Sequence, residues 1–233
     1  MENKTLFDFK KLQKLCFINR DEYFDITENN VYLLERFSNR LGDSEKDPFV
    51  GFIGSNYGNC NTRVLFLGRS GAESDESLGF VSDEAIYEKF KVFKNAKQDI
   101  KKHYRKYADQ ILAGIVDWRI YQFPKYFLDH TGLNMNDTAY ANILPYRYKG
   151  APTVGACKIA FKCFTNEFIS IVKPNLIVPL GANLGSTVVR FVKNFNGKIT
   201  NGISRTNGDR YIDEQGYKSL NNAINDFNRL SMQ

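Results

Sequence analysis

The sequence predicts an α/β fold with a short, mainly parallel sheet. Three apolar runs, at residues 63–68, 140–144 and 176–180, have the length and composition of buried strands, and helical patterns lie between them. Such alternation specifies a mainly parallel sheet with helices on both faces. Ligands of these sheets bind beyond the carboxyl ends of the strands, so the three strand ends are expected to converge on one crevice.

The helices are expected from apolar positions that recur at intervals of three and four residues. Pro124 breaks this periodicity, and Gly132 is a plausible C-cap, since glycine readily adopts the left-handed conformation that ends a helix. The expected helices cover residues 83–93, 94–105, 109–121, 126–131, 155–172, 183–192 and 214–230.

Composition favours one large domain, because 42% of the 233 residues are hydrophobic and 25% are charged. We expect residues 61–233 to form the α/β domain and residues 1–60 a helical or irregular elaboration packed on it. No run approaches the ~18 apolar residues of a membrane span, and the first residues do not lead into a signal peptide. A cytoplasmic monomer that binds no membrane is expected.

The charge favours an anionic partner. The formal net charge is +6 and the pI is about 9.0. Nucleic acid suits such a charge, although a modest excess of lysine is also common in proteins that bind nothing charged. The four cysteines form no C-x2-C pair and stand near no histidine-rich motif, so we expect neither a metal nor a cofactor.

The end of the first strand carries the first candidate site. Gly68, Arg69, Ser70 and Gly71 could form a tight turn in which glycine supplies positive φ, or the floor of a ligand site. Their spacing is neither that of a Walker loop nor that of a dinucleotide fingerprint. In the acidic loop that follows, Glu73 and Asp75 could position water or stabilise a developing cation. A solvated acidic loop is the alternative.

Two further residues suit the recognition of a flat ligand. Phe80 could stack on a ring or serve in ordinary packing. Asn142 ends an apolar strand, where a buried amide must find partners. An amide carries both donors and an acceptor, which suits the edge of a nucleobase.

Two basic or polar segments could contact a nucleic acid. Lys94, Lys97, Lys101 and Arg105 recur at intervals of three and four, so on one helix they would form a positive stripe suited to a phosphate backbone, or a solvated face. The polar loop at residues 202–211 precedes the last helix, and loops of this kind often carry function.

In this order, the motifs resemble the uracil-DNA glycosylase superfamily, from residue 63 to about residue 230. The resemblance depends on VLFLGRSG followed by LGF, on YANILPYR, on IVKPNLIVPLGA and on the polar loop before the closing helix. It implies a three-layer α/β/α sandwich and a hydrolase that flips a nucleotide out of DNA and cleaves its N-glycosidic bond.

The resemblance also implies roles for particular residues. The Gly68 to Gly71 turn would activate water and form the pocket, Phe80 would stack on the base, and Asn142 would read its edge. The segment from Ser204 to Asn207 would contact the leaving group and the minor groove.

The chain departs from the family at three places. Arg69, Ser70 and Gly71 occupy positions where relatives carry Asp, Asn or Glu, usually followed by proline, so Glu73 or Asp75 could substitute only if the loop folds back. Ser204 and Arg205 stand where a histidine is expected, and Arg205 would supply a permanent positive charge instead. Tyr146 replaces an expected cluster cysteine, so no iron–sulfur cluster is implied.

Three interpretations remain open at this point. The first is a divergent DNA glycosylase that acts on a uracil-like or modified base, in repair or in defence against phage DNA. The second is a DNA-binding member of the same fold that has lost catalysis. The third is an unrelated α/β enzyme that binds a nucleotide phosphate at the Gly68 to Gly71 turn.

Overall fold

The three apolar runs form the centre of the sheet in the computed structural model, which describes residues 7–18, 48–70, 83–145, 152–206 and 211–233. They are β2 (Val64–Gly68), β3 (Thr138–Asn142) and β4 (Leu176–Pro179), and every residue in them is buried. Burial on both faces explains why these strands read as continuous apolar runs rather than as alternating patterns. β2 pairs in parallel with both β3 and β4, which confirms the predicted parallel core.

Two short edge strands complete a five-stranded mixed sheet in the order β1-β3-β2-β4-β5. β1 (Phe52–Ile53) is antiparallel to β3, and β5 (Lys198–Ile199) is parallel to β4. The chain passes from β2 to β3 on one side and then crosses to β4 on the other side of β2. The carboxyl end of β2 is therefore a topological switch point, the usual ligand position in open α/β sheets.

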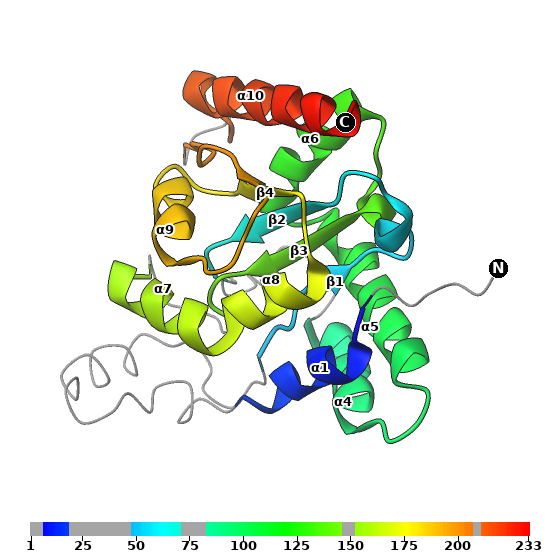
Figure 1. Ribbon diagram of the computed structural model, residues 1–233. Coiled ribbons are helices and arrows are strands. Elements are labelled where there is room, and N and C mark those ends of the chain that lie inside the picture. Colours follow the sequence, from blue (N-terminus) through cyan, green and yellow to red (C-terminus); the bar gives the residue numbers. More distant parts are fainter. Residues whose placement is uncertain (1–6, 19–47, 71–82, 146–151, 207–210) are drawn as a thin grey trace.

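Helices cover the sheet (Figure 1). α6 (Gln122–Thr131) and α10 (Glu214–Ser231) lie on one side of it, and α7 (Val154–Ala160) and α8 (Asn166–Val172) lie on the other. The arrangement is compatible with three α/β/α layers, while α9 (Leu184–Phe191) lies beside β4. The rings of Phe66 on β2 and Phe127 on α6 are 5.4 Å apart, which fixes the face of β2 that α6 covers.

The described part of residues 1–60 packs against the same core. α1 (Phe9–Lys14) lies beside α4 (Asp83–Asn95) and α5 (Ile100–Ile115), below the sheet in Figure 1. Phe9 and Leu12 are buried in the hydrophobic core that also contains the central strands. This segment therefore contributes a helix, and through β1 an edge strand, to the α/β unit.

Several expected helix bounds are wrong. Residues 94–105 do not form one helix, because α4 ends at Asn95 and α5 begins at Ile100, with the left-handed residue Asp99 (φ 51°) between them. Residues 109–121 are divided between α5 and the 3₁₀ turn η4 (Arg119–Tyr121). Pro124 does not interrupt a helix. It lies in the first turn of α6, where a backbone N–H has no partner within the helix, so proline removes no hydrogen bond.

Other expectations are confirmed or refined. Gly132 caps α6 at φ 70°, as expected. The helix expected over residues 155–172 is interrupted by the π-helical segment η6 (Phe161–Thr165), which aims the Thr165 hydroxyl at the Ile143 carbonyl, 2.9 Å away. The remaining 3₁₀ turns are η1 (Leu15–Phe17), η2 (Tyr57–Asn59) and η5 (Met135–Asp137). None of the helices in the described ranges is long and apolar enough to cross a membrane.

Candidate functional site

Gly68 and Asn142 meet at the carboxyl ends of β2 and β3. They are register partners, and both are buried. A Cβ atom on Gly68 would lie 2.4 Å from Asn142 Oδ1 and 3.1 Å from the Tyr140 hydroxyl. The position therefore needs glycine because the amide of Asn142 lies directly over its backbone. This contact joins two of the residues that the sequence singled out.

Tyr140 holds the amide of Asn142 in one orientation. Its hydroxyl donates a hydrogen bond of 3.1 Å to Asn142 Oδ1, and the two residues lie on the same face of β3. Burial raises the pKa of Tyr140, and the neighbouring Tyr211 raises it further, so the hydroxyl keeps its proton and remains a donor. Among the described residues, the hydrogen bond found for the Asn142 side chain is the one that its Oδ1 accepts from Tyr140.

Two aromatic rings pack against Tyr140. The Trp118 ring lies 6.1 Å from the Tyr140 ring, and the Phe49 ring lies 6.2 Å from each of them. Phe49 is held by its backbone N–H, which donates to the Pro145 carbonyl at 2.6 Å. Flat apolar surfaces therefore pack on the tyrosine that binds the buried amide, a combination suited to a heteroaromatic ring.

Arg205 reaches this cluster from the segment that follows β5. It donates a hydrogen bond to the Tyr211 hydroxyl, and its positive charge partly offsets the rise in the pKa of Tyr140. The ring of Tyr211 also lies 4.7 Å from the guanidinium of Arg119 and 5.1 Å from the stacked ring of Phe123. Positive charge is thus placed beside the hydroxyl that orients the amide.

Ser204 has a structural partner. Its hydroxyl donates to Asp213 Oδ2 at 2.6 Å, while Asp213 Oδ1 accepts from the backbone N–H of Gly216 at 2.6 Å and caps α10. These hydrogen bonds, first that from Ser204, hold the pKa of Asp213 below its ordinary value. Ser204 therefore fixes the loop that presents Arg205.

Arg69 and Ser70 follow Gly68 and are half-buried. Arg69 lies toward α7, since its charge opposes the burial that raises the pKa of the Cys157 thiol to about 11. The ladder continues past the strand ends, because the N–H of Leu144 donates to the Arg69 carbonyl at 2.9 Å. The turn after β2 is therefore anchored to β3 at least as far as Arg69.

The expected basic stripe lies elsewhere. Arg105 donates to the Ile53 carbonyl at 2.8 Å, and Ile53 pairs with Ala139, near the amino end of β3. Lys97 and Lys101 are exposed near this end, in the turn between α4 and α5 and in the first turn of α5, and Lys94 lies in the last turn of α4. The DNA-backbone role assigned to these four residues stays a prediction.

Five of the expected site residues lie outside the described residues: Gly71, Glu73, Asp75, Phe80 and Asn207. Tyr211 joins the cluster from the polar loop at residues 202–211, which the sequence analysis had singled out. Four residues that it had not singled out as site residues also join: Phe49, Trp118, Arg119 and Tyr140. Tyr140 could have been found from the alternation of a strand, which puts it on the same face as Asn142. The other three come from distant segments, and no local pattern marks them.

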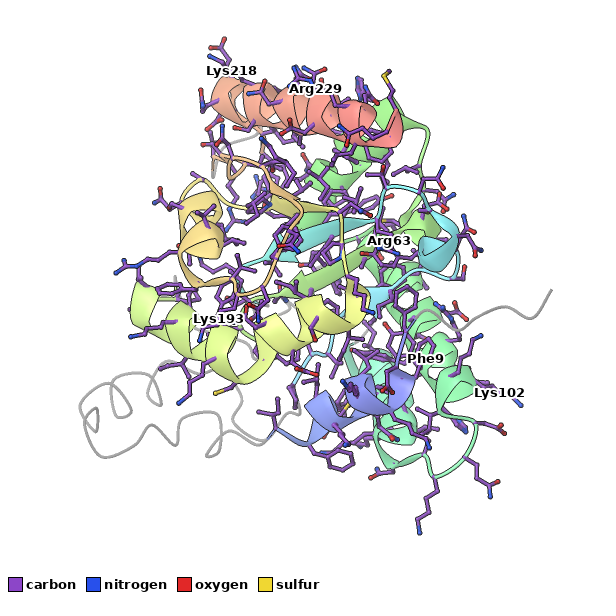
Figure 2. All side chains as sticks on the ribbon, viewed as in Figure 1. Phe9, Arg63, Lys102, Lys193, Lys218 and Arg229 are labelled. Atoms are coloured by element: carbon purple, nitrogen blue, oxygen red, sulfur yellow. The ribbon has the colours of Figure 1, made fainter. Side chains whose placement is uncertain are left out.

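Positive charge alone does not locate a ligand surface. The cations labelled in Figure 2, among them Lys102 on α5 and Lys218 and Arg229 on α10, are spread widely over the molecule. In the part of the chain that the structure describes, no group of three or more His, Cys, Asp or Glu residues is arranged to hold a metal ion.

Comparison with known proteins leaves the family open. No model of a known protein family matches the chain, and no curated protein matches it either. What the fold and the site define is an α/β protein with a mixed sheet and, at its switch point, a buried amide framed by tyrosines and arginines.

Proposed function

We propose that this protein is a divergent member of the uracil-DNA glycosylase superfamily that removes a uracil-like or modified base from DNA. The supporting observation is the Asn142 amide, held by the Tyr140 hydroxyl over Gly68 at the switch point. Because Oδ1 accepts from Tyr140, the Nδ2 donors would be the atoms of Asn142 that contact the ligand. A base with a carbonyl oxygen at the edge that it presents to Asn142 fits, whereas one with an amino group there does not.

In the proposed reaction, the bond between C1′ of the sugar and the ring nitrogen of the base breaks, and its electron pair leaves with the base. A water oxygen then bonds to C1′ and releases a proton. Arg205, which stays charged at all working pH values, would stabilise the anionic base, and Asn142 would donate to its oxygen. Glu73 or Asp75 would position the water. Phe80 would stack on the flipped base.

A second candidate is a DNA-binding protein of the same fold without catalysis. One observation favours it: Asp213, a carboxylate close to Arg205 in the sequence, is already bound to Ser204 and Gly216. In that case the cluster would bind an extruded base without cleaving it. The third candidate, a nucleotide-binding α/β enzyme, predicts tight binding of a free mononucleotide and indifference to DNA.

The experiment is base release, detected by mass spectrometry, from DNAs that contain uracil, hypoxanthine, or hydroxymethylated or glucosylated cytosine, with phage genomic DNA beside them. Asn142→Ala should lower release by about tenfold or more, since a hydrogen bond to a charged leaving group contributes about 1.5–3 kcal/mol. Asn221→Ala is the matched control, because Asn221 is exposed and accepts from Tyr126 on the outer face of α6 and α10.

The outcomes separate the three candidates. Release of one base that depends on Asn142 and not on Asn221 supports the glycosylase. Salt-sensitive DNA binding without release from any substrate favours the silent DNA-binding protein. Binding of a mononucleotide with no affinity for DNA would overturn both.

A further inference from the structure

A hydroxyl from the helices beside the sheet binds the end of the strand that carries Asn142. Thr165, the last residue of η6, is 1% exposed, and its hydroxyl donates to the Ile143 carbonyl at 2.9 Å. Ile143 directly follows Asn142 and is fully buried. A buried carbonyl requires a hydrogen-bond partner, and here a side chain from outside the sheet provides it.

The π-helical turn directs this hydroxyl away from its own helix. A threonine within a helix can donate to the carbonyl four residues earlier, as Thr131 does in α6, where its hydroxyl lies 2.9 Å from the Phe127 carbonyl. In η6 the N–H of Asn166 donates to the carbonyl of Phe161, five residues earlier, so the turn holds one residue more than an α-helical turn. One residue corresponds to a rotation of about 100° around a helix, which changes the face that Thr165 occupies. Such turns are rare and are frequently found at functional sites.

The hydrogen bond from Thr165 belongs to a connection between three segments at the candidate site. The carbonyl of the peptide group between Ile143 and Leu144 accepts from Thr165, and the N–H of the same group donates to the Arg69 carbonyl at 2.9 Å. One residue earlier, the N–H of Ile143 donates to the Gly68 carbonyl at 2.9 Å. These hydrogen bonds join η6, the end of β3 and the turn after β2.

The position of the Asn142 amide depends on this strand end. Its Oδ1 accepts from the Tyr140 hydroxyl and lies over Gly68, where a Cβ atom would be only 2.4 Å away. In a closely packed interior, the backbone of Asn142 has little freedom to move without altering both contacts. A hydrogen bond that holds the following peptide group therefore also restrains the amide.

We propose that Thr165 is a positioning residue, which keeps the Asn142 amide in the orientation for base recognition by holding the Ile143 carbonyl. This inference rests on the proposed function, because that function assigns the reading of a base to Asn142. Thr165 does not contact the base itself, since it acts through the backbone of β3.

Thr138 provides a matched control at the other end of the same strand. Its hydroxyl donates to the Met135 carbonyl at 3.0 Å, and the residue is fully buried. Thr165→Val and Thr138→Val each remove one hydroxyl and keep the size of the side chain. Both should lower Tm by a similar amount, since each leaves one carbonyl without this donor. Only Thr165→Val should affect Asn142.

The first readout is the side-chain amide signal of Asn142 in a proton–nitrogen correlation NMR spectrum, assigned by its loss in Asn142→Ala. The signal should shift or broaden in Thr165→Val and keep its wild-type position in Thr138→Val. Thr165→Ser retains the hydroxyl and should retain the wild-type signal. If Thr165→Val does not fold, Thr165→Ala gives the same comparison, because it removes the hydroxyl without placing a methyl group against the Ile143 carbonyl.

The second readout is competition binding with uracil- and cytosine-containing oligonucleotides. The preference for uracil should fall by about twofold to tenfold in Thr165→Val, the range that corresponds to one net hydrogen bond. It should be unchanged in Thr138→Val and in Thr165→Ser. Partial unfolding alone would lower the concentration of active protein and leave the preference as it is.

Two results would overturn the proposal. One is an Asn142 signal in Thr165→Val that equals that of the wild type. The other is an equal loss of preference in Thr165→Val and Thr138→Val, which would assign the effect to general destabilisation of β3. A wild-type protein that binds both oligonucleotides equally would instead refute the reading of a carbonyl edge by Asn142, and the NMR comparison would still decide whether Thr165 positions the amide.

Discussion

Two tyrosine-rich regions of the molecule use the same side chains for different purposes. Around α5, the Tyr104 hydroxyl accepts from the Ile53 N–H at 2.7 Å, and Arg105 donates to the Ile53 carbonyl at 2.8 Å. Both polar groups bind backbone and so fix the edge strand β1. At the carboxyl end of β3, the Tyr140 hydroxyl and Arg205 bind side chains instead.

The difference separates structural from ligand-facing polar groups. A hydroxyl or guanidinium that binds backbone completes the hydrogen bonding of a strand. It does not orient another side chain directly. One that binds another side chain sets the direction of that side chain and of its remaining donors. The second region is therefore where recognition is expected, although the first is richer in aromatic residues.

The largest effect is expected in the structural region. Phe93 is fully buried, 5.1 Å from the Tyr104 ring and 6.0 Å from the Tyr107 ring. Phe93→Ala should lower the free energy of unfolding by about 3–5 kcal/mol, the usual cost of such a cavity, in a urea titration. The neighbouring Val92→Ala, at a position 50% exposed, should change it by less than about 0.5 kcal/mol. Equal effects would contradict this packing.

A smaller loss is expected at the switch point. Gly68→Ala puts a methyl group against Asn142 Oδ1 and the Tyr140 hydroxyl, and overpacking of this kind costs about 1–3 kcal/mol. The matched control is Gly181→Ala, at the end of β4, where the nearest contact of the new Cβ atom would be an ordinary 3.7 Å to Leu184. Chemical denaturation should rank the two variants in that order, and base release should fall in the first alone.

Tyr140→Phe and Tyr104→Phe form a matched pair across the two regions. Each removes one buried hydroxyl and should cost about 0.5–1.5 kcal/mol of stability. Only Tyr140→Phe frees the Asn142 amide to rotate, so it alone should reduce the preference for a base that presents a carbonyl oxygen over one that presents an amino group. Competition binding with uracil- and cytosine-containing oligonucleotides measures this preference. An unchanged preference would show that Tyr140 does not orient the amide.

The smallest effect is expected in the dependence of thermal stability on pH. Because the pKa of Asp213 is lowered in the folded protein, its contribution to stability is present above the unfolded pKa, about 3.9, and is lost as the pH falls through the folded value. Asp213→Asn should therefore lower Tm at about pH 6, and its difference from the wild type should shrink as the pH falls below about 3.9. The control is Asp129→Asn, which removes the carboxylate of an exposed ion pair with Lys125. Parallel Tm curves for Asp213→Asn and the wild type would contradict this role.

Sequence patterns predicted the centre of the fold better than its margins. β2, β3 and β4 could be found because burial on both faces makes them continuous apolar runs. β1 and β5 were missed, since two residues each are too short to show any period. The helix bounds around Asp99 were wrong because a left-handed backbone is uncommon in residues other than glycine, and no glycine or proline marks the break between α4 and α5.

The candidate site was predictable only in part. Gly68 and Asn142 follow from the rule that strand ends meet at one edge, and their contact agrees with it. Trp118 and Arg119 reach that edge through contacts between segments far apart in the chain, which no local pattern contains. Tyr211, in contrast, lies in the polar loop at residues 202–211 that the sequence indicated. The same limit applies to Arg105, whose spacing did not indicate the hydrogen bond that it donates to a carbonyl of the edge strand, while its contact with phosphate stays a prediction.

Gln13 has a consequence for anyone who shortens this chain. Its side-chain amide donates to the carbonyl oxygens of Phe93, Lys94 and Ala96, at 2.9, 3.1 and 2.8 Å, and so closes the end of α4. A truncated version that began after residue 18 would leave these carbonyls without that donor and strip α1 from Phe93 and Tyr104. The smallest fragment that keeps the thermal stability of the protein therefore includes α1. This helix binds the carbonyl groups at the end of α4, although the two lie some eighty residues apart in the sequence.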